Sequence, residues 1–497
     1  MKLWLFLAPV LLWLGGCAST PSTTQTDAAD AAEAATSAAT TPKGLRPLAT
    51  NQAHQDPIAH LSLPNDLWER IRRGFAMPDL ETDLVEDRVQ WYASRPDYLL
   101  RMTERSRKYL YYIVEELERR QMPTELALLP FIESAFNPQA VSSAKAMGMW
   151  QFMPRTGKDF DLKQNVFRDD RRDVQASTRA ALDYLQRLYG MFGDWHLALA
   201  AYNWGEGNVG KAIARNQRSG TGTAYTDLNM PMETRFYVPK LQAIKNLVAR
   251  PAQYSVQLPE IHNHPYFQSV PLPRDMDVTV AAKLADISVE DFKSLNPSAN
   301  RPVLLAAGTP QILLPWDNAE TFQQNYEAFG SGQLATWTAW VAPTTLKVPE
   351  AARRAGLSEE EFRRVNNIPP RMVIKAGSAL LVPRSARMDE DVNSEVADNG
   401  RLDLAPEIEQ RRVVVKAGKK DTVATLAQQY KVTEAQIADW NDWRAGTRLQ
   451  AGQSVVLMLS TPVKTAAKKG GKGSKVKTAK AKSPAPAAAS TTKVAKR

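Results

Sequence analysis

Apolar residues recur three and four positions apart in the first half of the chain, which is the spacing of an amphipathic helix. The pattern covers residues 67–120 and returns at residues 173–189, 195–201 and 233–248. Alternation of apolar and polar residues, the sign of a half-buried strand, does not occur between residues 67 and 250. The sequence therefore predicts a mostly α-helical domain in this part of the chain.

A carboxylate interrupts the most apolar stretch of this half, which reads ELALLPFIESAF from position 125 and contains Glu133. A helix here ends before Asn137-Pro138, because a residue that precedes proline avoids the helical conformation. Glu133 then lies in the last turn, where the helix dipole and the apolar neighbours favour a neutral carboxyl and raise its pKa. A raised pKa suits a general acid; pairing with a nearby arginine such as Arg155 is the alternative. Pro130 removes a backbone hydrogen bond and predicts a kink one turn before Glu133.

The second half of the chain repeats one pattern three times. Residues 287–296, 357–366 and 432–441 each contain Ser or Thr, an apolar residue four positions later and Asn eight positions later. An N-cap, a buried helix position and a turn residue account for these three choices. A glycine and a short apolar strand follow each copy, and a strand precedes the last one. The pattern predicts a strand–helix–helix–strand unit of about 45–50 residues.

The chain begins with a short apolar segment that ends at its only cysteine. Residues 3–14 are mostly apolar, too few to span a bilayer and typical of the core of a signal peptide. The following Leu-Gly-Gly-Cys resembles the bacterial lipobox, in which the cysteine, here Cys17, becomes the lipidated first residue of the mature protein. Ala18 and Ser19 follow it, and without an aspartate beside the cysteine the resemblance implies an outer-membrane lipoprotein facing the periplasm. An ordinary signal peptide with an incidental cysteine is the alternative.

Composition narrows the classes of function. The formal net charge of +10 comes from the tail, because residues 461–497 hold ten Lys, one Arg and no acid. The rest of the chain is nearly neutral, and we expect no nucleic-acid partner. One cysteine excludes an intrachain disulfide framework and a cysteine metal cluster, and five scattered histidines do not indicate a metal site. We expect neither a metal nor another cofactor.

Four short motifs in the helical half carry the chemistry. They are Glu133-Ser134, Ser142-x5-Gly148-x2-Gln151-x-Met153-Pro154, Ala201-Tyr202-Asn203-x-Gly205 and Tyr237-Val238. In this order they resemble the soluble-lytic-transglycosylase-type domain, over residues 123–248. The resemblance implies a lysozyme-like fold that cleaves the glycan strands of peptidoglycan. The three repeats resemble LysM modules, which bind such N-acetylglucosamine-containing strands, although the first two copies lack the family's strand-plus-Gly-Asp opening.

The resemblance assigns a role to each motif position. Glu133 corresponds to the sole catalytic acid/base. Three positions would line the cleft: Ser142, Gln151 and Met153. Tyr202 and Asn203 would contact the sugar near the acid, and Tyr237 would support the site. For these positions, packing in the core is the alternative. Trp150 stands where the family usually has an aliphatic residue, and it could stack on a sugar or pack in the core.

The mechanism implied by the resemblance depends on the lack of a second catalytic carboxylate in the motifs. Ordinary glycosidases use two carboxylates, whereas no second acid falls within the four motifs. The muramyl C6 hydroxyl would then act as the nucleophile and leave a 1,6-anhydromuramyl end, with a role in cell-wall turnover or remodelling. A muramidase that uses water, and a non-catalytic wall-binding lipoprotein, are the alternatives.

The expected fold class is α+β multidomain, with a mostly α lysozyme-like catalytic domain followed by three small βααβ LysM-like modules. The expected parts, in order, are a signal peptide (1–17), a disordered tether (18–57), the catalytic domain (58–255), two degenerate LysM-like modules (270–315 and 336–383), an acidic linker (384–410), a LysM module (411–459) and a basic disordered tail (460–497). The expected partners are peptidoglycan glycan strands and, through the lipid, a membrane. The sequence indicates no oligomeric state.

Overall fold

The computed structural model describes residues 64–461 apart from positions 331, 387, 408 and 445. The predicted signal peptide, the lipidation site Cys17, the tether and nearly all of the basic tail lie outside these residues. Among the described helices, none combines the length and the apolar character needed to cross a bilayer.

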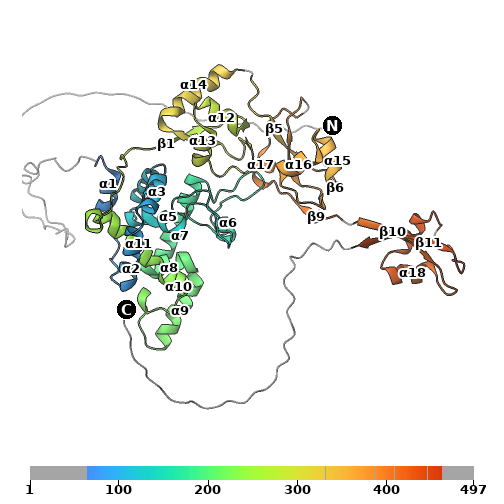
Figure 1. Ribbon diagram of the computed structural model, residues 1–497, viewed down its shortest axis with the longest axis horizontal. Helices are drawn as coiled ribbons and strands as arrows, with labels where there is room; N and C mark the ends of the chain where they lie inside the picture. The colour runs from blue at the N-terminus through green and yellow to red at the C-terminus, as the bar shows by residue number, and fades with distance from the viewer. Residues whose placement is uncertain (1–63, 331, 387, 408, 445, 462–497) are drawn as a thin grey trace, which may run out of the picture. The chain divides into compact units, whose positions relative to one another are not determined.

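Helices form the first part of the structure, which Figure 1 draws in blue and green. Residues 64–266 are all described, and they form isolated bridges but no β-strand. The prediction of a mostly α-helical domain is therefore confirmed. The helices are α1 (Leu67–Arg73), α2 (Asp83–Ala93), α3 (Pro96–Ser106), α4 (Leu110–Arg119), α5 (Leu129–Ser134), α6 (Pro154–Asp159), α7 (Val174–Phe192), α8 (Trp195–Trp204), α9 (Glu206–Arg218), α10 (Met232–Arg235) and α11 (Tyr237–Ala249), with 3₁₀ turns η2 (Thr124–Leu128), η3 (Tyr225–Asp227) and η4 (Pro251–Tyr254).

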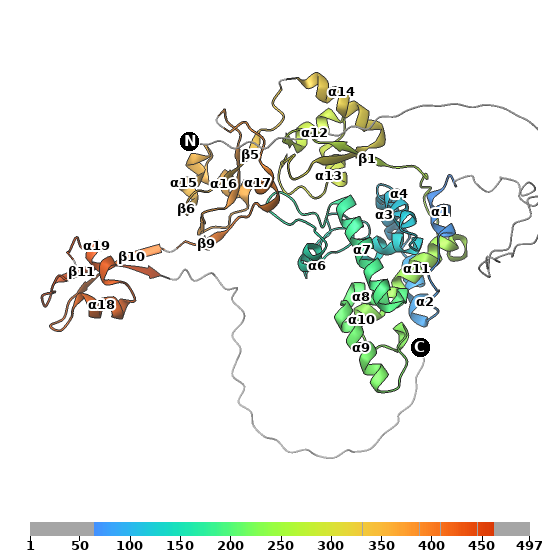
Figure 2. The ribbon, with the colours of Figure 1, turned by 180° about the vertical axis from the view of Figure 1, so that it is seen from behind.

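Helix α11 runs through the core of this domain and contacts α2, α5 and α8. Its residues are buried on nearly every side, from Tyr237 at its first turn to Val248 near its end. A helix that is apolar all round is typical of such a central position. Figure 1 shows α11 near α2, α5 and α8, and Figure 2 shows it beside α2 from behind. The buried start of α11 thereby places Tyr237 inside the domain, close to α5.

The three repeats form the second part, and each has the predicted order of elements. The first contains β1 (Phe267–Pro271), β2 (Met276–Asp277), α12 (Val278–Leu284), α13 (Val289–Leu295), β3 (Val303–Leu304) and β4 (Gln311–Pro315), followed by η5 (Trp316–Asn318) and α14 (Ala319–Phe329). The second contains β5 (Trp337–Val341), β6 (Leu346–Lys347), α15 (Val348–Arg354), α16 (Glu359–Asn366), β7 (Met372–Ile374) and β8 (Ala379–Pro383). The third contains β10 (Glu409–Lys416), α18 (Val423–Tyr430), α19 (Glu434–Trp440) and β11 (Ser454–Thr461). The expected α+β multidomain class is confirmed.

All three repeats open with a strand, which corrects the strand part of the expectation that the first two copies lack a strand-plus-Gly-Asp opening. In each repeat the opening strand pairs antiparallel with the closing strand: β1 with β4, β5 with β8 and β10 with β11. The opening strands β1 and β5 are only five residues long. Five residues are too few for alternation to be recognised, and the partner strand, about 40 residues away in sequence, provides the hydrogen bonds that define them.

The repeated Ser or Thr and the repeated apolar residue take the predicted positions. Ser288, Ser358 and Thr433 are N-caps whose side-chain oxygens each accept a hydrogen bond from the third backbone N–H of the following helix. The residues four positions later are fully buried: Phe292, Phe362 and Ile437. These two features hold the second helix of each repeat against its sheet.

The repeated asparagine bridges two elements of its repeat, buried in the first two repeats and half-buried in the third, which corrects its interpretation as a turn residue. The Asn366 amide nitrogen donates to the carbonyls of Phe362 and Leu381 at 3.1 and 3.0 Å, and its oxygen accepts from the Leu381 N–H at 2.7 Å. Asn296 and Asn441 make the same three bonds in their own repeats. The asparagine therefore joins the second helix to the closing strand and satisfies backbone groups that burial would otherwise leave unpaired.

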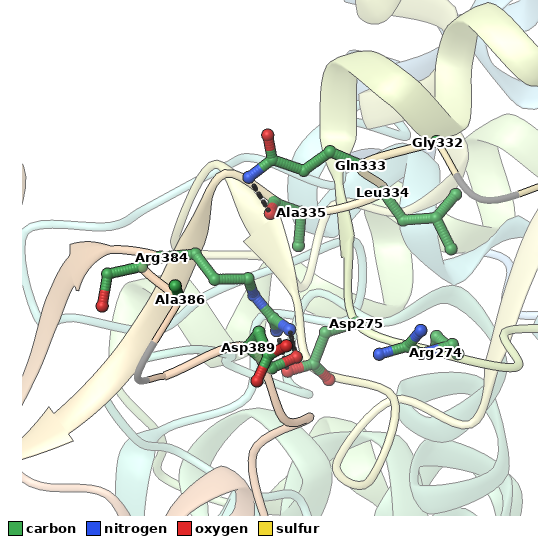
Figure 3. Close-up of a pocket in the computed structure, with 10 residues that line it drawn as sticks. Arg274, Asp275, Gly332, Gln333, Leu334, Ala335, Arg384, Ala386 and Asp389 are labelled. Atoms are coloured by element: carbon green, nitrogen blue, oxygen red, sulfur yellow. Dashed lines mark hydrogen bonds and ion pairs between the residues drawn. The ribbon is translucent and has the colours of Figure 1, made fainter.

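The acidic stretch 384–410, expected as a linker, carries elements of its own. It contains α17 (Ser394–Asn399) and β9 (Leu404–Pro406), and β9 adds to the second repeat by pairing with β7. At the start of this stretch, Arg384 forms an ion pair with Asp275 of the first repeat at 3.2 Å, and both side chains are more than nine-tenths buried. Figure 3 shows this pair in a cavity of about 340 Å³, lined only by residues of the repeats and of the stretches that join them.

Candidate active site

Glu133 lies in the last turn of α5, as the sequence predicts. The two residues after the end of α5, Ala135 and Phe136, adopt left-handed backbone conformations with φ of 51° and 54°. The Phe136 N–H closes the helix by donating to the Pro130 carbonyl at 3.0 Å. Because Pro130 stands in the first turn of α5, where the chain switches from the 3₁₀ turn η2, the predicted kink inside a longer helix is wrong.

Two tyrosines from separate helices surround the Glu133 carboxyl. The hydroxyl of Tyr237, at the start of α11, donates a hydrogen bond to Glu133 Oε1. Tyr202 of α8 lies near enough for the charge of Glu133 to raise its pKa, and its hydroxyl donates to the Trp150 carbonyl at 2.9 Å. The fold thus brings together three positions, the outermost of which, Glu133 and Tyr237, are 104 residues apart in sequence.

Burial raises the pKa of Glu133 from its ordinary 4.5 to about 7. The hydrogen bond from Tyr237 opposes this rise because it stabilises the carboxylate. Lys240 also lowers the pKa through its charge, and Glu233 raises it. Glu133 is therefore close to half protonated at neutral pH, so that the same group can give a proton and take one back.

The alternative of a paired glutamate is not supported. Within the described residues no arginine or lysine lies within ion-pair distance of Glu133, and the cation whose charge reaches it is Lys240 rather than Arg155. Nor do His, Cys, Asp and Glu side chains of residues 64–461, where described, gather in any group of three that could hold a metal ion.

A tight loop between α5 and α6 carries Ser142 and Gln151. Ser142 is tied into the loop, since its hydroxyl accepts from the Ala146 N–H at 2.9 Å. Gln151 has a left-handed backbone with φ of 50°, and its side-chain amide donates to the Gly148 carbonyl at 2.8 Å. Gly148 itself has φ of 85°, and a Cβ there would meet the Arg171 carbonyl oxygen at 2.0 Å, so only glycine fits.

Arg171 clamps this loop from the other side. Its guanidinium donates to the carbonyls of Lys145 at 2.9 Å and Phe152 at 3.3 Å. It also pairs with Asp169 at 2.6 Å, and both side chains are nearly buried. On the helix side, the Ser134 hydroxyl donates to the Met149 carbonyl at 2.9 Å. The loop is therefore held to the residue next to Glu133 and to the segment before α7.

The remaining predicted positions differ in exposure. Met153 is 43% exposed at the start of α6 and is available to a ligand. The Asn203 side-chain oxygen accepts from the Thr234 hydroxyl at 2.8 Å, which joins α8 to α10. Trp150 is fully buried and donates to Thr178 at 3.1 Å, so of the two roles considered for it the structure selects packing in the core.

The sequence analysis missed the two charges that act on Glu133. Glu233 stands four residues before Tyr237, and Lys240 stands three residues after it. The spacing around Tyr237 is the one signal that could have indicated them, because residues three and four apart share a helix face. The helix predicted over residues 233–248 is divided in the structure into α10, which holds Glu233, and α11, which holds Lys240. Their distances to Glu133 therefore could not be worked out from the spacing.

Comparison with family models defines the class of protein. The model described as "Transglycosylase SLT domain" matches residues 111–224, which include Glu133 and Tyr202. The model described as "Lytic transglycosylase MltD, LysM-like domain" matches residues 266–331, and the LysM domain model matches residues 352–383 and 414–457. The fold, the site and these matches together define a lytic transglycosylase with LysM repeats.

Full-length relatives narrow this class to one family. The chain is 32% identical over 425 residues to membrane-bound lytic murein transglycosylase D of Escherichia coli strain K12, a match that covers 82% of this chain and 89% of the relative. This chain belongs to the membrane-bound lytic murein transglycosylase D family. It is also 30% identical to membrane-bound lytic murein transglycosylase C of Haemophilus ducreyi, over 33% of this chain and 45% of that one. Among solved structures, the 70 kDa soluble lytic transglycosylase of Escherichia coli matches with 25% identity and a TM-score of 0.21, over 27% of this chain and 22% of the other.

Proposed function

We propose that this protein cleaves the β-1,4 bond between MurNAc and GlcNAc in peptidoglycan and leaves 1,6-anhydromuramyl ends, for turnover or remodelling of the cell wall. The observation that carries the proposal is the Glu133 carboxyl, whose pKa burial raises to about 7 while Tyr237 hydrogen-bonds it. A lone carboxyl with this pKa serves as acid and then as base within one reaction.

The proposed reaction balances with Glu133 alone. Protonated Glu133 gives its proton to the glycosidic oxygen as the bond from that oxygen to muramyl C1 breaks, and the GlcNAc 4-hydroxyl leaves. The Glu133 carboxylate then takes the proton of the muramyl C6 hydroxyl as O6 bonds to C1. Glu133 ends protonated and no water is consumed. Tyr237 steadies the carboxylate between the two proton transfers, because its hydroxyl is a donor to Oε1.

Substrate contacts come from the surrounding positions in this proposal. Met153 offers an exposed apolar surface for a sugar face. The side-chain nitrogen of Asn203 is available because the carbonyl oxygen is the atom that Thr234 uses. Gln151 and Ser142 sit on the clamped loop, and Tyr202 lies beside the acid.

Glu233 favours one second candidate function. A carboxylate close enough to raise the pKa of Glu133 could direct a water molecule, which is how an inverting glycosidase uses its second acid. The enzyme would then be a muramidase and give reducing ends. Mass spectrometry of digested sacculi separates the two reactions, because an anhydro end is one water lighter than a reducing end. Reducing ends as the main product would overturn the transglycosylase proposal.

The catalytic role of Glu133 has its own test. Glu133→Gln is expected to abolish lysis of purified peptidoglycan while binding to sacculi persists through the LysM repeats. Full lysis by this variant would remove Glu133 from the reaction. Lysis by neither the variant nor the unaltered protein, with binding retained, would instead favour a wall-binding lipoprotein.

We further propose that Cys17 is lipidated and holds the protein at the outer membrane, facing the periplasm. The lipobox-like sequence and the family membership support this proposal. Metabolic labelling with a radioactive fatty acid is expected to label the unaltered protein and not Cys17→Ala. Equal labelling of both would refute the anchor.

A further inference from the structure

A groove of about 830 Å³ lies where the catalytic domain meets the first repeat. On the catalytic side it is lined by Arg105 and by the turn that follows α5, including Phe136. On the repeat side it is lined by Glu290 and Lys293 of α13. Its volume is in the range of ligand-binding pockets. Neither domain forms this groove alone.

Hydrogen bonds hold the two walls together. Lys108 Nζ donates to Asp291 Oδ1 at 3.1 Å and to the Ser294 hydroxyl at 2.9 Å. The hydroxyl of Tyr109, itself 2% exposed, donates to the Ser294 carbonyl at 2.8 Å. Helix α13 is thereby fixed against the start of α4. The charge of Lys108 is paired with Asp291 between the two walls. The other charged residues that line the groove are Arg105, Lys293 and Glu290.

The charges of the groove lie beside an apolar floor. Phe136 and Pro138 are buried, and Val289 is half-buried, and all three line it. Arg105, Lys293 and Glu290 are exposed, and among the described residues none of the three takes part in an ion pair. Two cations, one anion and an apolar floor match a short acidic peptide that carries small apolar side chains and one amino group.

The groove is also close to the catalytic carboxyl. Phe136 follows Glu133 by three residues, and three residues span at most about 11 Å. Arg105 reaches the same turn, since its guanidinium lies 3.5 Å from the Ala135 carbonyl oxygen. A peptide of four residues extends up to about 14 Å, so a peptide attached to a muramyl residue at Glu133 is long enough to enter the groove.

We infer that this composite groove binds the stem peptide of the peptidoglycan strand that is being cleaved. The carboxylates of the stem would meet Arg105 and Lys293, its amino group would meet Glu290, and its alanine methyl groups would lie on the floor. The first repeat then acts as a wall of the substrate site. This inference rests on the proposed function and deepens it, because it assigns the protein a preference for peptide-bearing glycan.

The test compares two substrates that differ only in the peptide. Initial cleavage rates are measured on peptidoglycan that keeps its stem peptides and on the same material after an amidase has removed them. The variant is Arg105→Glu with Lys293→Glu, and the control is Lys283→Glu, an exposed charge reversal on α12 outside the groove. Thermal unfolding of each variant confirms that the fold is intact.

We expect the double variant to cleave peptide-bearing material roughly tenfold more slowly than the unaltered protein, since two exposed attractions become repulsions. Its rate on stripped glycan should not change, and Lys283→Glu should be unchanged on both substrates. High salt should reduce the tenfold difference because the groove charges are exposed. An equal loss on both substrates, or no loss on either, would overturn the inference. If the unaltered protein cleaves neither substrate, that result would instead count against the proposed function.

Discussion

The hydrogen bond from Tyr237 to Glu133 makes a prediction about the pH profile of the enzyme. Tyr237→Phe removes the largest of the interactions that lower the pKa of Glu133 and leaves the burial that raises it. A hydrogen bond to a charged group contributes about 1.5–3 kcal/mol, and one pKa unit corresponds to about 1.4 kcal/mol. The pKa of Glu133 should therefore rise by about 1–2 units above its present value of about 7.

The assay is the pH dependence of kcat/KM on soluble glycan fragments. The proposed reaction begins with protonated Glu133, so activity falls on the alkaline side as this carboxyl loses its proton. Tyr237→Phe should move the alkaline limb upward by about 1–2 pH units and lower the maximal rate. Tyr225→Phe is the matched control, because this buried hydroxyl donates to the Thr234 carbonyl at 2.6 Å and makes no bond to Glu133.

Three results would refute the reasoning. An alkaline limb that stays in place in Tyr237→Phe would mean that Glu133 is not the group that titrates there. A limb that moves downward would mean that Tyr237 stabilises the protonated carboxyl rather than the carboxylate. A shift of equal size in Tyr225→Phe would show that the limb reports a general change of the fold.

Three further predictions concern charge and burial. A carboxyl with a raised pKa makes the folded protein less stable as the pH rises from about 4.5 to about 7. Urea unfolding should therefore find Glu133→Gln about 3 kcal/mol more stable than the unaltered protein at pH 8 and equally stable at pH 4. Equal stability at pH 8 would contradict the burial of this charge. Glu233→Gln removes a negative charge that raises the pKa of Glu133. The alkaline limb of the pH profile should therefore move downward by a few tenths of a unit, while anhydro ends stay the main product. A switch from anhydro ends to reducing ends would assign Glu233 a direct role. Asn366→Ala leaves buried backbone groups of Phe362 and Leu381 without hydrogen-bond partners and should destabilise the second repeat by about 2–3 kcal/mol. Hydrogen exchange of the β8 amides measures this loss. Unchanged exchange would show that the asparagine bridge is dispensable.

Much of the fold could be predicted because its signals are local. The N-caps Ser288, Ser358 and Thr433 act on the helix that each one starts, so a spacing of a few residues reveals them. The position of Glu133 near a helix end followed in the same way from the Asn-Pro pair that comes after it. The short strands β1 and β5 were not found, because their hydrogen-bond partners stand about 40 residues further along the chain.

The candidate site was predicted as a set of residues but not as an arrangement. The resemblance of the motifs to the family indicated Glu133, Tyr202 and Tyr237, and the structure brings these three together. Spacing carried no information on the Arg171 clamp, since Arg171 acts across about 20 residues of loop through backbone carbonyls that every sequence has. The effects of Glu233 and Lys240 were hidden for a similar reason, because they depend on distance in space.

The order of helices, the three repeats and the place of Glu133 near a helix end follow from residue types and their spacing along the chain, and the family resemblance of the motifs indicates Glu133 as the acid. The tertiary structure alone decides that Glu133 has a pKa of about 7, that Trp150 packs in the core, and that each repeated asparagine joins a helix to the closing strand of its repeat. It also decides that the first repeat shares a groove with the catalytic domain. The physical reason is that burial, electric field and buried hydrogen bonds depend on which distant segments meet, and that is set when the whole chain packs.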